Sequence, residues 1–151
     1  MVLESALIRD IQQSVISHLQ LNKLLCTMRT SYEKLLQPSE FANDEPVGLA
    51  ALDKSLLPGP IEEKYWTYIS ERLWSRIISY GAAYQLHFHQ LVEPVVDTVL
   101  NPLQCDSLGE ELEFLSGVAN DPALLEALSV LRNEVYKVVN RKSMCLVISP
   151  P

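Results

Sequence analysis

The side chains that could bind a metal or act as nucleophiles are three histidines and three cysteines. His87 and His89 stand two residues apart, which on a helix places them about 200° apart around the axis. A zinc pair on a helix instead takes positions i and i+4, which share one face. The cysteines, Cys26, Cys105 and Cys145, are odd in number and widely spaced, with no CxxC pair. We therefore expect no metal site and no disulfide framework, and interpret the cysteines as reduced intracellular thiols.

Paired carboxylates are the remaining candidates for catalysis. Glu62-Glu63 and Glu110-Glu111 fall where first helical turns are expected, and there acidic residues stabilise the positive end of the helix dipole. The sequence contains no GxGxxG, Walker, GxSxG or HExxH motif. We therefore predict that the protein is not an enzyme and uses no cofactor.

The length and net charge of the chain limit the number of domains and the classes of binding partner that we expect. A chain of 151 residues is long enough for one domain, and its 48% apolar content excludes wholesale disorder. The net charge of −7 argues against binding to nucleic acid or to an anionic membrane. The N-terminus carries charges, and the apolar stretch 144–148 is too short to span a bilayer. We expect an intracellular, cytoplasmic protein with no membrane span in this chain.

The stretch from Trp74 to Val92 is the segment around which we expect the chain to fold. It contains no Asp, Glu, Lys or Arg between Arg76 and Glu93. A surface helix needs a polar face, so the pattern predicts a central helix buried on most sides. Its glutamines and histidines disfavour a membrane span.

Helices are predicted for most of the remaining chain. Asp121-Pro122 is an N-cap followed by proline, and it opens a helix to about Asn140. The residues of that helix expected to face inward are Leu124, Leu128, Leu131, Val135 and Val138. The other segments expected to be helical are 4–20, 21–36, a short piece in 47–56, 60–70, a helix opened by Pro94 and stopped at Asn101-Pro102, and 107–117 after a capping box. The prediction is an all-α globular bundle of six to eight helices around one buried central helix, with a single domain over 1–142 and a C-terminal tail over 143–151.

One motif in the central segment resembles a known family. Residues 73–83 read LWSRIISYGAA, which resembles the first homology motif of the Bcl family of apoptosis regulators, roughly Asn-Trp-Gly-Arg-Ile-Val followed by small and aromatic residues. The matching residues are Trp74, Arg76, Ile77, Ile78 and Tyr80. Leu73 and Ser75 depart from the motif, a divergence similar to that of viral members.

The resemblance implies an anti-apoptotic protein that holds the amphipathic death-motif (BH-three) helix of pro-apoptotic partners in a hydrophobic groove. Arg76 would pair with the aspartate of that helix, because a guanidinium can fork a carboxylate with two hydrogen bonds. The implied location includes the mitochondrial surface, reached through partners. The residues expected to form the groove are Leu25, Met28, Tyr32, Ile69, Leu73, Ser75, Arg76 and Ser79.

A second function class stays open: a helical scaffold or self-association domain without an apoptotic role. In that case Arg76 forms an ion pair at the surface or at the edge of the core. Homodimer formation is compatible with both classes. The observation that separates them is whether Arg76 lies exposed on the floor of an apolar groove.

Overall fold

The computed structural model divides the chain into two compact units, Met1–Leu35 and Leu36–Pro151, and describes residues 37–151. The predicted helices of the first 36 residues, and the predicted groove residues Leu25, Met28 and Tyr32, lie outside the described residues. The described part contains four α-helices and a four-stranded antiparallel sheet. The all-α prediction is therefore wrong, and the fold is mixed α and β.

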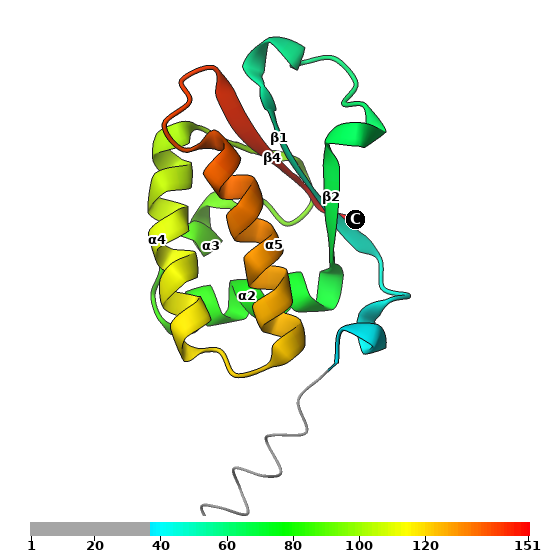
Figure 1. Cartoon of the computed structure of the whole chain (residues 1–151), viewed down its shortest axis with the longest axis vertical. Helices are drawn as coiled ribbons and strands as arrows, with labels where there is room; N and C mark the ends of the chain where they lie inside the picture. Colours follow the sequence, from blue (N-terminus) through cyan, green and yellow to red (C-terminus); the bar gives the residue numbers. More distant parts are fainter. Residues whose placement is uncertain (1–36) are drawn as a thin grey trace, which may run out of the picture. The chain divides into compact units, whose positions relative to one another are not determined.

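The sheet brings together strands from both ends of the described chain (Figure 1). Its order is β2-β1-β4-β3, so β2 and β3 form the two edges. The strands are β1 (Pro46–Asp53), β2 (Trp66–Ser70), β3 (Thr98–Leu100) and β4 (Met144–Ser149). Residues 144–149, which the sequence assigned to a tail, thus form an inner strand.

Two long helices pack against each other and against the sheet (Figure 1). They are α4 (Pro102–Val118) and α5 (Pro122–Val138); the shorter ones are α2 (Glu71–Ala83) and α3 (Phe88–Leu91), with 3-10 turns η1 (Pro38–Phe41), η2 (Lys54–Leu56) and η3 (Glu63–Tyr65). Asp121 caps α5 as predicted, because its Oδ1 accepts the N–H of Ala123 at 3.0 Å. Asn101-Pro102 was predicted to end a helix, but it begins α4: Asn101 Oδ1 accepts the N–H of Gln104 at 2.9 Å.

The main core lies between α5 and one face of the sheet. Leu49, Leu146 and Ile148 supply the sheet side and are fully buried. All five residues predicted to face inward from the last helix are buried there, so that prediction is confirmed. Burial of these branched apolar side chains is the largest favourable term in holding the layers together.

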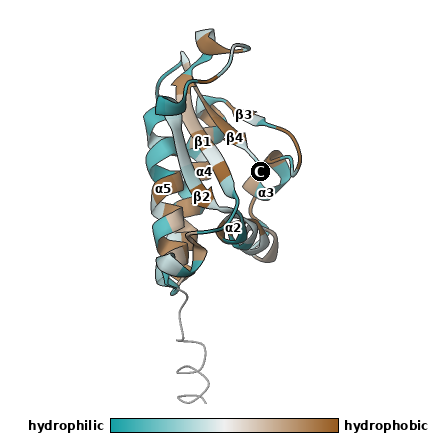
Figure 2. Cartoon of the chain, turned by 90° about the vertical axis from the view of Figure 1, so that its right-hand side faces the viewer, coloured by the Kyte–Doolittle hydropathy of each residue, from teal (hydrophilic) through white to brown (hydrophobic). Residues whose placement is uncertain are grey.

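The opposite face of the sheet has its own apolar cluster, formed by Ala50, Leu52, Cys145 and Val147. Leu57, Ile61 and Tyr65, from the connection between β1 and β2, pack against it. Because β4 is covered on both faces, its sequence is a continuous apolar run rather than an alternating one. Figure 2 shows this hydrophobic colouring along β4.

Three segments predicted as helix are strands or loops. The segment 47–56 forms most of β1, the segment 60–70 passes through η3 into β2, and the chain after Pro94 leads into β3. In β2 the reason lies in the composition: Trp, Thr, Tyr and Ile favour the pleated strand.

The expected central helix is shorter and less buried than predicted. Helix α2 buries Leu73, Trp74 and Ile77 but exposes Ser75 and Arg76. It ends in a Schellman motif: Gln85 has φ 57°, and the N–H of Leu86 bonds to the carbonyl of Gly81 at 2.8 Å. The prediction of a central helix over 74–92 that is buried on most sides is therefore wrong. The stretch after Arg76 has no charged residues, but its serine, alanine, glutamine and histidine residues form an exposed face, so the lack of charge did not mean burial.

Candidate functional site

The structure separates the predicted groove residues that it describes. Ile69 and Leu73 line one hollow beside α2, whereas Ser75 and Ser79 line another. Arg76 lines neither of these two hollows. The predicted groove thus corresponds, within the described residues, to two separate depressions.

The first depression, which we call the β2 hollow, has a volume of about 190 Å³. It lies where the edge strand β2 meets α5, the start of α2 and η1. Most of the residues that line it are apolar, and the full lining is Pro38, Phe41, Ala42, Tyr68, Ile69, Ser70, Leu73, Ala123, Glu126, Ala127 and Val130.

Helix α5 forms the wall of the β2 hollow with small side chains. Ala123 and Ala127 stand one turn apart and are followed by Val130, so these three residues share one helical face. Because Ala123 and Ala127 end at Cβ, space remains between α5 and the edge of the sheet. Larger side chains at these two positions would fill it.

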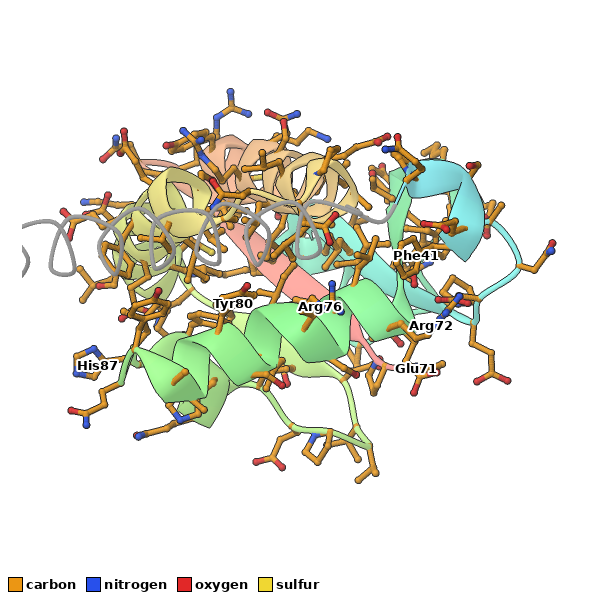
Figure 3. All side chains as sticks on the ribbon, turned by 90° about the horizontal axis from the view of Figure 1, so that it is seen from below. Phe41, Glu71, Arg72, Arg76, Tyr80 and His87 are labelled. Atoms are coloured by element: carbon orange, nitrogen blue, oxygen red, sulfur yellow. The ribbon has the colours of Figure 1, made fainter. Side chains whose placement is uncertain are left out.

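Turn η1 is held against α2 by Arg72. Its guanidinium forks the carboxylate of Asp44 at 2.7 and 2.6 Å, donates to the carbonyl of Glu40 at 3.0 Å, and lies 4.8 Å from the ring centroid of Phe41. Ser70 also donates its hydroxyl to Asp44. The hydrogen bond from Arg72, followed by that from Ser70, holds the pKa of Asp44 below its ordinary value of 3.8. Figure 3 shows Arg72 and Phe41 together at one end of α2.

The backbone N–H and C=O of Tyr68 point outward from the outer edge of β2, the edge strand of the sheet formed by residues 37–151. The N–H of Glu71 donates to the carbonyl of Glu45 at 2.9 Å, which continues the β1–β2 ladder beyond the pair Pro46 and Ser70. Bonded pairs alternate in an antiparallel ladder, so Ile69 and Thr67 point their N–H and C=O groups toward β1. Those of Tyr68 point away, and within residues 37–151 they have no backbone partner.

Three glutamate side chains lie near the outer edge of β2. The hydroxyl of Tyr68 donates to Glu63 at 2.8 Å, and that of Thr67 donates to Glu134 at 3.0 Å. Glu134 is buried and also pairs with Lys137 at 2.5 Å. Glu126 lines the hollow, and within the described part of the chain neither Glu126 nor Glu63 forms an ion pair. The edge therefore carries negative charge that this part of the chain does not neutralise.

The second depression, which we call the C-terminal hollow, has a volume of about 400 Å³. Its polar hydroxyl groups are partly used within α2, since Ser79 donates to the carbonyl of Ser75 at 2.8 Å. Its lining is Glu71, Trp74, Ser75, Ile78, Ser79, Val92, Pro94, Pro150 and Pro151.

Arg76 lies on the exposed side of α2, where Figure 3 places it between Arg72 and Tyr80. Its Nη1 is 3.1 Å from Oδ2 of Asp121, the residue that caps α5. The side chain of Arg76 is 45% exposed, whereas that of Asp121 is 13% exposed. This ion pair at the edge of the core ties α2 to the start of α5.

Local roles are found for His87, Cys105 and Cys145, whereas His18 and Cys26 lie outside the described residues. His87 Nδ1 lies 3.1 Å from Glu111, whose two oxygens also accept the backbone N–H groups of His87 and Phe88 at the start of α3. Cys105 and Cys145 are free and buried. Desolvation raises the pKa of the Cys105 thiol to about 12, and so suppresses the reactive thiolate.

Residues 37–151 were considered for two further kinds of feature, a metal centre and a membrane span, and form neither. No cluster of three or more His, Cys, Asp or Glu side chains there could hold a metal ion. Nor does this part of the chain contain a helix with the length and hydropathy of a membrane span.

Several residues around the β2 hollow were not predicted as site residues. Ala123, Glu126 and Ala127 were passed over because the inward stripe of α5 is carried by its leucines and valines. Tyr68 falls within the predicted helix over 60–70, which does not form. The available signal was the strand composition of 66–70; the pairing of α5 with η1 has no signature in the sequence.

Comparison with known protein families, with characterised proteins and with solved structures gave no match to this chain.

Proposed function

We propose that this chain is a protein-interaction domain that binds an apolar peptide segment of a partner protein in the β2 hollow. The single observation that carries the proposal is the combination found there. A depression lined mainly by apolar residues opens beside a strand edge whose Tyr68 backbone groups are unpaired within the described residues. Peptide recognition draws its affinity from such edges and its specificity from the adjacent pockets.

The proposal keeps part of the sequence-based hypothesis and leaves part behind. Ile69 and Leu73, predicted to contact a partner, line the hollow. The apoptotic role depended on resemblance to an all-α family, and the sheet contradicts that fold. Pairing of Arg76 with an aspartate of a partner helix stays a prediction. In this structure the guanidinium of Arg76 forms an ion pair with Asp121.

A second candidate function is self-association, which a different surface favours. Around β3 the side chains of Val95, Val96, Val99 and Leu103 are all exposed. Exposed apolar side chains next to a strand edge favour pairing with another chain. Sedimentation of the full chain over a range of concentrations tests this candidate independently of peptide binding.

The test of the proposed function is a selection from a random peptide display library against the full chain. The variant Ala127→Leu fills the hollow, and Ala83→Leu adds the same atoms on the exposed end of α2. We expect the selected peptides to bind the Ala127→Leu variant at least about tenfold more weakly, while Ala83→Leu binds normally. Thermal melting of both variants checks that they are folded. Selection of no peptide, or of peptides that bind both variants equally, contradicts the proposal.

A further inference from the structure

We propose that the β2 hollow takes its peptide as an extended strand added to the outer edge of β2, with one apolar side chain in the hollow and Lys or Arg residues beside Glu63 and Glu126. This inference rests on the function proposed above and adds to it the conformation and the charge of the partner segment.

The backbone argument concerns Tyr68. Its N–H and C=O point away from β1 and have no backbone partner in residues 37–151, so they can pair with an added strand without breaking any bond of the existing ladder. The residues that line the hollow include Tyr68, Ile69 and Ser70 in succession. A strand beside β2 therefore runs along the depression.

The size argument separates a strand from a helix. Pockets that enclose a drug-sized ligand have volumes of about 300–1,000 Å³. The β2 hollow, at about 190 Å³, is smaller and suits one side chain. A helix bound by anchors at i, i+3, i+4 and i+7 needs a longer trough. A strand needs only one such pocket, because its main-chain hydrogen bonds supply the rest of the contact.

The charge argument identifies the chemistry of the partner. Glu126 lines the hollow, Glu63 accepts the hydroxyl of Tyr68, and neither carboxylate has an ion-pair partner among residues 37–151. The chain as a whole carries a net charge of −7. A basic segment is attracted to this edge, whereas a second copy of the chain is repelled by its like charge.

The first arm of the experiment uses the tightest peptide from the library selection. Its backbone is N-methylated at one position at a time, and binding to the full chain is measured by calorimetric titration. Only every other N–H of an added strand points at β2, so we expect losses of about tenfold at alternate positions and little change between them. Uniform losses across the peptide, as a bound helix gives, overturn the strand inference.

The second arm tests charge. We expect the selected peptides to alternate apolar residues with Lys or Arg. Replacement of these basic residues by glutamine weakens binding of the full chain. The Glu126→Lys variant weakens binding of the basic peptide about two- to fivefold, as expected for an exposed ion pair. Glu110→Lys makes the same charge change on an exposed site of α4 and serves as the matched control. Selected peptides that are acidic, or equal effects of the two variants, overturn the charge part.

The outcomes separate the two levels of the proposal. If peptides are selected and Ala127→Leu blocks them, but N-methylation shows no alternation, the hollow binds peptides and the strand inference is wrong. If no peptide depends on the hollow, the proposed function itself is wrong. Concentration-dependent pairing of the chain that competes with the peptide at this edge shows a second copy as the occupant, and also overturns the inference.

Discussion

The two edges of the sheet, β2 and β3, each have one residue whose backbone N–H and C=O point outward, but the surroundings of the two edges differ. At β2, Tyr68 turns its N–H and C=O outward. At β3, Val99 does the same. The backbone N–H of Lys54 donates to the carbonyl of Ser143 at 2.8 Å, and because bonded pairs alternate along the β1–β4 ladder, Leu146 and Ile148 turn their backbone groups toward β3. They bond there to Leu100 and Thr98, so the backbone groups of Val99, between those two residues, point outward. The two residues are similarly exposed, Tyr68 at 46% and Val99 at 50%.

What differs is what lies beside each edge. The edge of β2 adjoins a hollow walled by α5 and η1 and bordered by carboxylates. That of β3 is three residues long and adjoins exposed valines. An unpaired strand edge is by itself only a liability that proteins must manage. It becomes a selective site when a helix places a pocket next to it, so we expect changes at β2 and at β3 to have unequal effects.

The largest expected difference is in stability. Ile69 is buried between β2 and the helices, so Ile69→Ala should lower the free energy of unfolding by about 2–5 kcal/mol. Val99→Ala removes an exposed side chain at the other edge and should change it by no more than about 0.5 kcal/mol. Urea denaturation measures both. Equal losses would show that both edges are integrated with the core to the same degree.

The next prediction concerns peptide binding. Proline is tolerated on an edge strand where the N–H faces away from the ladder. Tyr68→Pro removes the outward donor of β2 and should weaken binding of a selected peptide about tenfold. Tyr68→Ala controls for the lost ring, and Val99→Pro makes the matching change at β3 and should leave binding unaffected. Calorimetric titration of the selected peptide into all three variants measures these effects. If the two proline variants weakened binding equally, the two edges would not differ in peptide binding.

A smaller effect is expected from the helix caps near the two edges. Asp121 caps α5, which walls the β2 hollow, and Asn101 caps α4 directly after β3. Substitution of either by alanine should cost about 1 kcal/mol of stability, as measured by denaturation. Only Asp121→Ala should also weaken the selected peptide, because it loosens the start of α5 and frees Arg76. A binding loss of equal size in Asn101→Ala would mean that the peptide senses general stability.

The last prediction concerns how the contact between Arg72 and Asp44, which holds η1, contributes to stability as the pH changes. We expect this contribution to be the smallest of the four at neutral pH. The pKa of Asp44 is lower in the folded chain than its ordinary value of 3.8, because Arg72 and Ser70 donate to the carboxylate. The stabilisation is therefore present in full only well above the ordinary pKa of 3.8, and it is lost as the pH falls from there through the lower folded pKa. Carboxyl carbon shifts should titrate with a midpoint below 3.8 for Asp44. A midpoint at or above 3.8 would show that the fork does not form in solution.

The sequence predicted the elements whose signals are local. The proline after Asp121 and the leucine and valine stripe of α5 lie within one stretch of chain, and the structure confirms both. Ile69 and Leu73 were also selected as contact residues, although for a groove in a different fold.

The strands were missed for physical reasons. A strand of three to eight residues gives too short a pattern to separate from a buried helical segment. In β4 the alternation is absent, because both faces are covered. The lack of charges after Arg76 was taken for burial, yet neutral polar side chains form an exposed face equally well.

The β2 hollow could not be predicted because tertiary contacts create it. Ala123 and Ala127 are ordinary helix residues until α5 lies beside the edge of β2 and η1 closes the other side. The position of η1 depends in turn on Arg72 reaching Asp44, 28 residues away in the sequence.

Amide hydrogen exchange at Tyr68 tests the central claim most directly. In the free chain its N–H should exchange rapidly, while those of Thr67 and Ile69, which bond to β1, should be protected. On saturation with a selected peptide, the Tyr68 amide should become protected, and the Val99 amide at the other edge should be unchanged. A Tyr68 amide that still exchanges rapidly in the saturated complex would contradict strand addition at β2.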